Sequence, residues 1–164
     1  MSYSIFEYRK SSSCNFLDEG ANGFEVKIEA NGIIEYSEFD FEENCLEYKL
    51  YQLSQDGVRK IMRAIENNSE VFNVNSVLDN GSDDGDENRF WFSTKKRNIE
   101  IVDWNIGDSI DELQVDDSMI RFDECLSQER IVLKLFFEIC DILKNEKFKL
   151  NLDEFKINSR NVIL

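Results

Sequence analysis

The chain has 164 residues, a formal net charge of −15, 41% apolar residues and 32% charged residues. Its length fits one domain, 1–164, and its aromatic content, with 13 Phe, excludes an intrinsically disordered chain. The chain contains no histidine, which excludes His-based acid–base catalysis, Ser-His-Asp and Cys-His nucleophiles and His metal ligands.

The start of the chain and its cysteines indicate a cytoplasmic protein. Residues 1–10 place their positive charge after the apolar residues and lack the apolar region of a secretory signal. No apolar run approaches the roughly 20 residues that span a bilayer, so we expect no membrane contact. The four cysteines include no C-x-x-C pair, and Cys140 falls in a hydrophobic helical pattern. We therefore expect four free thiols without a zinc or redox role.

The clearest local pattern is an early β-hairpin. From Phe24 to Ala30, apolar and charged residues alternate, which is typical of a strand with one buried face. Asn31-Gly32 follows, a dipeptide that supplies the two positive φ angles of a type I′ turn, and a return strand begins at Ile33. The alternation from Leu46 to Leu50 predicts a third strand and an antiparallel meander.

The next segments predict a helix and a second hairpin. Ser54 is suited to cap an amphipathic helix over about 55–67, where apolar residues follow helical spacing. Residues 89–94 and 98–104 flank the basic run 95–97, and together they indicate a second hairpin with that run in its turn.

A long apolar helix is predicted over about 128–145, with a single narrow polar stripe. A helix this apolar is either buried in the core or covers part of itself against a partner or a second copy in a homodimer. Alternation over 148–152 predicts a closing strand. The predicted fold class is α+β, an antiparallel sheet of two hairpins plus the closing strand, packed by the two helices. The stripe consists of Lys134, Glu138, Asp141 and Asn145.

The negative charge is concentrated in two segments. Residues 35–47 carry a net charge of −6 and residues 79–124 a net charge of −9, which together equal the charge of the whole chain. Such a field repels nucleic acid and anionic membranes and attracts basic partners, with a strength that falls with salt. The alternative is that the acidity only maintains solubility. The candidate partner-binding residues are Glu35, Glu38, Asp40, Glu42, Glu43, Asp79, Asp83, Asp84, Asp86, Glu87, Asp108, Asp111, Glu112, Asp116 and Asp117.

Metal, cofactor and catalytic motifs are weak or absent. Aligning Gly85 with the glycine of an EF-hand loop puts Trp91 at the position of the bidentate glutamate, so the acidic loop does not fit that calcium site. No Gly-rich phosphate loop opens a helix. Asp103, beside Trp104, is a possible member of a carboxylate pair in a hydrolase, but acids are too abundant for proximity to be informative. We expect no metal, no cofactor and no enzymatic activity.

Four aromatic residues could form a stacking surface, although packing of a two-sided strand in the core is favoured. A nucleic-acid-binding surface would also need positive charge beside its aromatic residues, and the net charge here is negative. The residues are Phe90, Trp91, Phe92 and Trp104.

The chain resembles the small acidic immunity proteins of bacterial toxin systems. The resemblance lies in the early hairpin over 24–36, the helix after Ser54, the acidic loop 79–87 and the apolar helix over 131–143. It implies a non-enzymatic protein that neutralises a basic toxin domain, often a nuclease, by docking an acidic face on it. The alternatives are a phage-type DNA mimic that occupies the channel of a nuclease, and a housekeeping domain or carboxylate-based hydrolase with incidental acidity.

Overall fold

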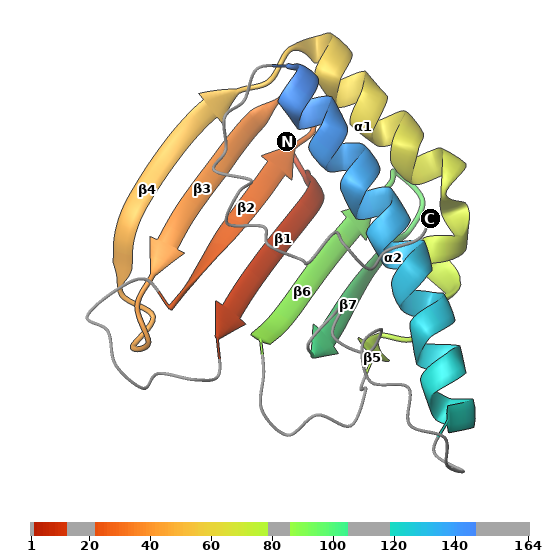
Figure 1. The fold of residues 1–164 in the computed structure, drawn as a ribbon. Helices are drawn as coiled ribbons and strands as arrows, with labels where there is room; N and C mark the ends of the chain where they lie inside the picture. Colours follow the sequence, from red (N-terminus) through yellow and green to blue (C-terminus); the bar gives the residue numbers. More distant parts are fainter. Residues whose placement is uncertain (1, 13–21, 79–85, 105–118, 147–164) are drawn as a thin grey trace.

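A computed structural model describes residues 2–12, 22–78, 86–104 and 119–146, and these form an α+β fold with one seven-stranded, mostly antiparallel sheet and two α-helices (Figure 1). The strand order is β4-β3-β2-β1-β6-β7-β5, and only β5 runs parallel to its neighbour. The predicted closing strand over 148–152 lies outside the described residues. The strands are β1 (Ser4–Ser12), β2 (Gly23–Glu29), β3 (Ile33–Phe39), β4 (Cys45–Gln52), β5 (Val77–Leu78), β6 (Asp86–Ser93) and β7 (Asn98–Trp104).

The middle strand, β1, was not predicted from the sequence. It pairs with β2 on one side and with β6 on the other, and so joins the two predicted hairpins into one sheet. Phe6 and Tyr8 face the core, whereas Glu7 and Arg9 lie on the other face, as the period of a strand requires. This alternation is the sequence signal of the strand.

The hairpin between β2 and β3 has a different turn from the predicted type I′. The loop has three residues, Ala30 to Gly32, and Gly32 has a φ of 90°. Among the described residues, Glu43 is the one non-glycine with positive φ, so Asn31 does not adopt the second positive angle of a type I′ turn. The Gly32 N–H donates to the Glu29 carbonyl, as in a type I turn closed by a left-handed glycine.

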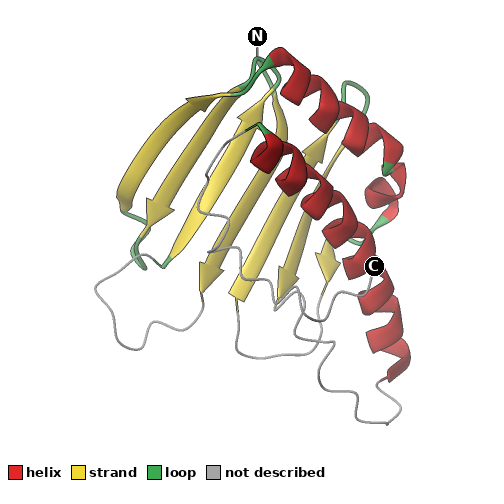
Figure 2. Ribbon diagram, turned by 45° about the horizontal axis from the view of Figure 1, so that its top comes forward, coloured by secondary structure: helices red, strands yellow, loops and turns green. Residues whose placement is uncertain are grey.

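Both helices lie on the same face of the sheet (Figures 1 and 2). Helix α1 (Gln55–Asn67) covers the range predicted from the sequence, and the Ser54 hydroxyl caps it by accepting the Gly57 N–H at 2.9 Å. Helix α2 (Met119–Asn145) begins before the predicted start at Gln128. Residues 119–128 contain neither glycine nor proline, so no residue among them interrupts a helix. A short 3₁₀ helix, η1 (Ser69–Asn73), follows α1.

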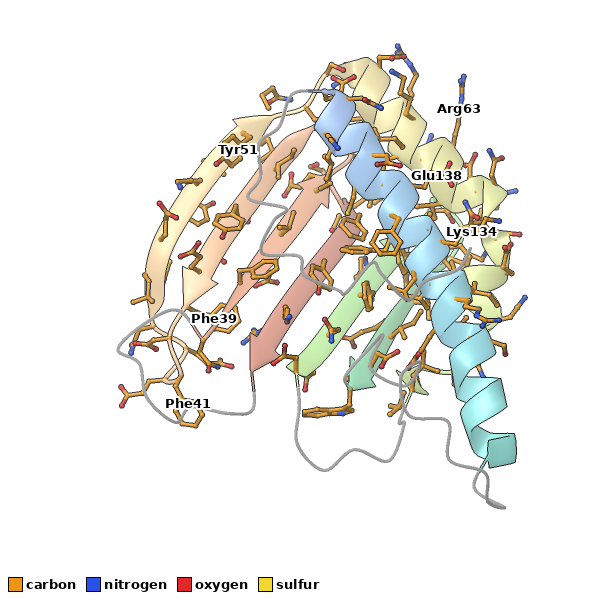
Figure 3. All side chains as sticks on the ribbon, viewed as in Figure 1. Phe39, Phe41, Tyr51, Arg63, Lys134 and Glu138 are labelled. Atoms are coloured by element: carbon orange, nitrogen blue, oxygen red, sulfur yellow. The ribbon has the colours of Figure 1, made fainter. Side chains whose placement is uncertain are left out.

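The core lies between the sheet and the two helices and is rich in aromatic rings. The Phe136 ring of α2 lies 4.8 Å from the ring of Tyr8 and 5.5 Å from that of Phe90, measured between centroids. The predicted polar stripe of α2 is exposed, and Figure 3 shows its members Lys134 and Glu138. The two helices and the core residues between them and the sheet thus cover one face of the sheet. Neither described helix is long and apolar enough to cross a membrane.

Candidate functional site

The sheet face opposite the two helices, here called the open face, carries a regular array of charged side chains. Directly paired residues on neighbouring strands lie on the same face, so the strand register identifies the members of the array. Acids outnumber bases in it. The array consists of Glu7, Glu25, Glu29, Glu35, Glu87 and Glu100 with Arg9, Lys27 and Arg89.

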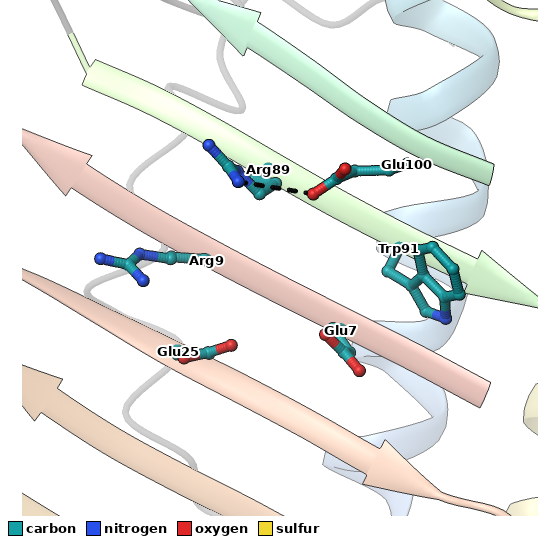
Figure 4. Close-up of a pocket in the computed structure, with 6 residues that line it drawn as sticks. All are labelled: Glu7, Arg9, Glu25, Arg89, Trp91 and Glu100. Atoms are coloured by element: carbon teal, nitrogen blue, oxygen red, sulfur yellow. Dashed lines mark hydrogen bonds and ion pairs between the residues drawn. The ribbon is translucent and has the colours of Figure 1, made fainter. Parts of the chain in front are cut away.

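Trp91 lies within this array, between two glutamates. Its direct cross-strand partners are Glu7 on β1 and Glu100 on β7. With Glu25 and the two arginines of the array, these residues line a shallow pocket of about 220 Å³ (Figure 4). The pocket combines an aromatic ring with carboxylates on both sides, an arrangement that attracts a cationic side chain by cation–π and charge–charge interactions.

The two arginines of the pocket are already paired. Arg89 contacts Glu87 at 2.9 Å and Glu100 at 3.5 Å, and Arg9 contacts Glu43 at 2.8 Å. Within the described part of the chain, no ion pair involves Glu7 or Glu25. Among the described residues these two carboxylates therefore have no ion pair within 4.0 Å, although the register places Lys27 opposite Glu7 and Arg9 opposite Glu25.

The position of Arg9 depends on a close contact of Gly23 with the backbone of β1 and with the Phe39 ring. A Cβ on Gly23 would overlap the Lys10 carbonyl oxygen and come within 2.7 Å of the Phe39 ring, so only glycine lets that ring lie across β2. The Arg9 guanidinium stacks on the Phe39 ring at 4.3 Å and also binds Glu43. The end of β1 is thereby joined to the turn between β3 and β4.

That turn and the end of β3 before it contain several predicted partner-binding residues, and two of them have structural roles. The Asp40 carboxylate accepts the N–H groups of Glu42 and Asn44, both at 2.9 Å, and hydrogen bonding by Asn44 lowers its pKa. Glu38 accepts a short hydrogen bond from the Tyr36 hydroxyl. Glu43 is likewise held in the ion pair with Arg9, so Glu35 and Glu42 remain as the candidates for partner contact in this segment. Figure 3 shows Phe39 and Phe41 at this end of the sheet.

The structure brings Glu42 and Glu43 of the first acidic segment and Asp86 and Glu87 of the second to the same end of the sheet. Phe39 pairs with Gly23 at the end of β3, while Asp86 pairs with Ser12 at the start of β6. Gly23 and Ser12 lie at the connected ends of β2 and β1. Asp86 binds Lys10 at 2.9 Å. The first half of the candidate calcium loop, 80–85, lies outside the described residues, and its second half, 86–91, forms part of β6. The remaining predicted acids also lie outside the described residues: Asp79, Asp83, Asp84, Asp108, Asp111, Glu112, Asp116 and Asp117.

The four aromatic residues considered as a stacking surface divide between the two sides of the sheet. Phe90 and Phe92 are fully buried in the core, as predicted. Trp91 and Trp104 lie on the open face, where the register pairs Trp104 with Glu87. The predicted turn over 94–97 is present, with the Thr94 N–H donating to the Arg97 carbonyl at 2.8 Å, and it lies at the end of the sheet opposite the acidic residues.

Asp103 belongs to a buried carboxyl pair and not to an exposed site. Asp103 on β7 is 0% exposed and Glu129 on α2 is 1% exposed. Apart from the Glu129 carboxyl, no hydrogen-bonding partner reaches either Asp103 oxygen in the described residues. Burial, together with Glu129, raises the pKa of Asp103 to about 9, so this carboxyl retains its proton at neutral pH. A substrate would have to displace α2 to reach the pair.

The pocket contains three glutamates that were not predicted from the sequence, namely Glu7, Glu25 and Glu100. They come from three different strands. Glu7 and Glu25 lie outside both acidic segments, and Glu100 lies within the second one. Their one local signal is alternation with apolar residues, which marks the solvent side of a strand. Cys45 and Cys140 are free thiols. No group of three or more Asp, Glu or Cys side chains is placed to hold a metal ion in residues 2–12, 22–78, 86–104 and 119–146.

No protein-family model matches the chain, and no curated protein matches it.

Proposed function

We propose that the chain is a non-enzymatic binding protein that neutralises a basic protein partner, and that its partner-binding surface is the open face with the adjoining acidic end of the sheet. The biological role that fits this chemistry best is that of an immunity protein that inhibits a toxin, for example a nuclease. The observation that carries the proposal is the position of Trp91 between Glu7 and Glu100.

The proposal rests on how interfaces use such residues. Aromatic side chains and arginines carry much of the binding energy of protein interfaces, and a lysine or arginine of the partner would be bound by both the ring and the carboxylates. The unpaired Glu7 and Glu25 would replace the phosphate that such a base holds in a nuclease. The net charge of −15 would increase the rate at which a basic partner associates.

The two alternatives are less well supported. A DNA mimic needs an uninterrupted row of carboxylates spaced like phosphates, but Arg9, Lys27 and Arg89 lie among the acids of the open face. A carboxylate-based hydrolase would need a substrate to reach Asp103 and Glu129, which are enclosed between the sheet and α2.

Affinity capture tests the proposal. The purified chain is immobilised and exposed to a lysate of cells that naturally express it, and captured proteins are identified by mass spectrometry. We expect a basic protein, whose purified form binds with an affinity that falls at least about tenfold between 50 and 300 mM NaCl. The activity of that protein should be abolished at a one-to-one ratio.

Variants of the pocket provide the matched comparison. We expect Trp91→Ala to weaken binding by roughly 10- to 100-fold, and Glu7→Gln and Glu100→Gln by about 3- to 10-fold each. Glu66→Gln on the exposed side of α1 is the control and should leave the affinity unchanged. Capture of no basic protein, or an affinity indifferent to salt and to Trp91→Ala, would refute the proposal.

A further inference from the structure

Strand β4 forms one edge of the sheet and is exposed along almost its whole length. In the described residues it has a neighbour, β3, on one side only. Tyr48 is 55% exposed and Leu50 is 60% exposed, and the register pairs them with Ser37 and Glu35, which places both on the open face. Leu46 is also exposed. An apolar edge strand of this kind is a template for pairing with another strand.

The backbone of β4 is arranged to receive such a strand. The Leu53 N–H donates to the Gly32 carbonyl, which continues the ladder between β3 and β4. In an antiparallel pair, residues that bond to the neighbouring strand alternate with residues whose N–H and C=O groups point away from it. Counting back from Leu53, Tyr51, Lys49 and Glu47 bond to β3, whereas Leu50 and Tyr48 direct their backbone groups to the free edge.

We propose that this edge binds a second copy of the same chain, through antiparallel pairing of the two β4 strands about a two-fold axis at Tyr48. This register makes β4 complementary to itself. Glu47 of one copy lies opposite Lys49 of the other, and Leu46 lies opposite Leu50. The regular pairing ends at Leu46, because the register of β4 with β3 shifts between Glu47 and Cys45. Two seven-stranded sheets thereby join into one continuous sheet.

The charges on and beside β4 in one copy favour a second copy of the chain as the binding partner. Glu47 lies directly opposite Glu38 of β3, and two like charges in direct cross-strand positions repel each other. Lys49 contacts Glu47 at 2.6 Å, and the hydrogen bond with Glu47, together with Glu38 and other neighbours, raises the pKa of this lysine. In the dimer, Lys49 of the second copy lies on the other side of Glu47, so each copy supplies a positive charge where the other has an excess of carboxylates.

Sedimentation velocity of the full chain tests the proposal. Because the net charge of −15 on each copy opposes association at low ionic strength, the measurement is made at about 150 mM NaCl, where the Debye length is roughly 8 Å. We expect a species of twice the 19.3 kDa chain mass, whose fraction rises with concentration. Amide hydrogen exchange at Tyr48 and Leu50 should slow as that fraction rises.

Charge reversal distinguishes this interface from any other. Glu47→Lys alone and Lys49→Glu alone each place like charges opposite one another and should lower the dimer fraction at least tenfold. An equimolar mixture of the two variants restores opposite charges at every contact and should form a mixed dimer. The double variant E47K/K49E should dimerise like the native chain, and the remote control Lys95→Glu should not change the dimer fraction.

Three results would overturn the proposal. The first is a chain that remains monomeric at the highest concentration reached. The second is a dimer that persists unchanged in both single variants, which would place the contact elsewhere, for example on α2. The third is a mixture of the two single variants that fails to associate.

Discussion

At the scale of single residues, the protonated carboxyl of Asp103 makes a pH-dependent contribution to stability. Its pKa of about 9 in the folded chain lies above the ordinary value of 3.8, so between these values the native state holds a proton that the unfolded chain has released. The free energy of unfolding therefore falls as the pH rises from about 4 to about 9. The groups around Asp103 include Asn88 on β6, its cross-strand partner, and Glu129 on α2.

We predict that Asp103→Asn removes most of this slope. The amide is neutral at every pH and can donate a hydrogen bond to Glu129. Because one unit of pKa shift corresponds to about 1.4 kcal/mol, the variant should exceed the native chain in stability by a few kcal/mol near pH 8.5 and lose that advantage near pH 4. Urea unfolding across this range measures the difference. Asp141→Asn, at an exposed position of α2, should leave the slope unchanged, and a difference that does not vary with pH would contradict the prediction.

Gly23 is the residue on which the position of Arg9 depends. We predict that Gly23→Ala lowers the free energy of unfolding by roughly 1–3 kcal/mol, because the added methyl group must displace both the Lys10 carbonyl and the Phe39 ring. Ser11→Ala, at the directly paired position on β1, adds no atom and serves as the control. Equilibrium unfolding of the two variants measures the cost, and a value for Gly23→Ala within 0.5 kcal/mol of the control would show that the close approach is not a constraint.

At the scale of secondary-structure elements, Ser54 couples the start of α1 to the end of α2. Its hydroxyl accepts the Gly57 N–H at 2.9 Å and donates to a Glu146 carboxylate oxygen at 2.7 Å. We predict that Ser54→Ala costs about 1 kcal/mol of stability, the ordinary value of a lost N-cap, and that Ser54→Asn, which keeps an acceptor and a donor, restores most of it. Thermal unfolding compares the two, and equal melting temperatures would contradict the assigned role.

The elements also show which parts of the fold could be predicted. The strands β2 and β3, helix α1 and the hairpin of β6 and β7 have local signals, namely alternation, a cap and turn residues. The central position of β1 has none, because it is determined by pairing with two strands that are distant in sequence. The same reason explains why the acidic segments could be predicted from the sequence and the pocket could not. A run of acids can be read directly from the sequence, but Glu7, Trp91 and Glu100 become neighbours only through the register of three strands.

At the scale of the whole molecule, the charge is segregated along the strands. Asp86 and the turn with Glu42 and Glu43 lie at one end of the sheet, and the basic turn over 95–97 lies at the other. Ion pairs such as the one between Arg9 and Glu43 neutralise a part of the acidic end. The remaining excess produces a directional field, so a basic partner would approach with the acidic end and the open face in front.

The excess of negative charge also lowers the stability of the folded chain, and the dependence of the melting temperature on ionic strength measures this effect. At 10 mM salt the Debye length is roughly 30 Å and the acids of the whole molecule repel one another, whereas at 150 mM it is about 8 Å. We predict that the melting temperature at neutral pH rises by several degrees between these concentrations, since exposed ion pairs that weaken over the same range contribute only about 0–1 kcal/mol each. Glu42→Lys, at the acidic end, should raise the melting temperature at 10 mM and have little effect at 150 mM. Glu66→Lys changes the net charge equally but lies on α1, which carries Arg59, Lys60 and Arg63, so its gain should be smaller. Equal gains from the two variants would show that the total charge matters and its segregation does not.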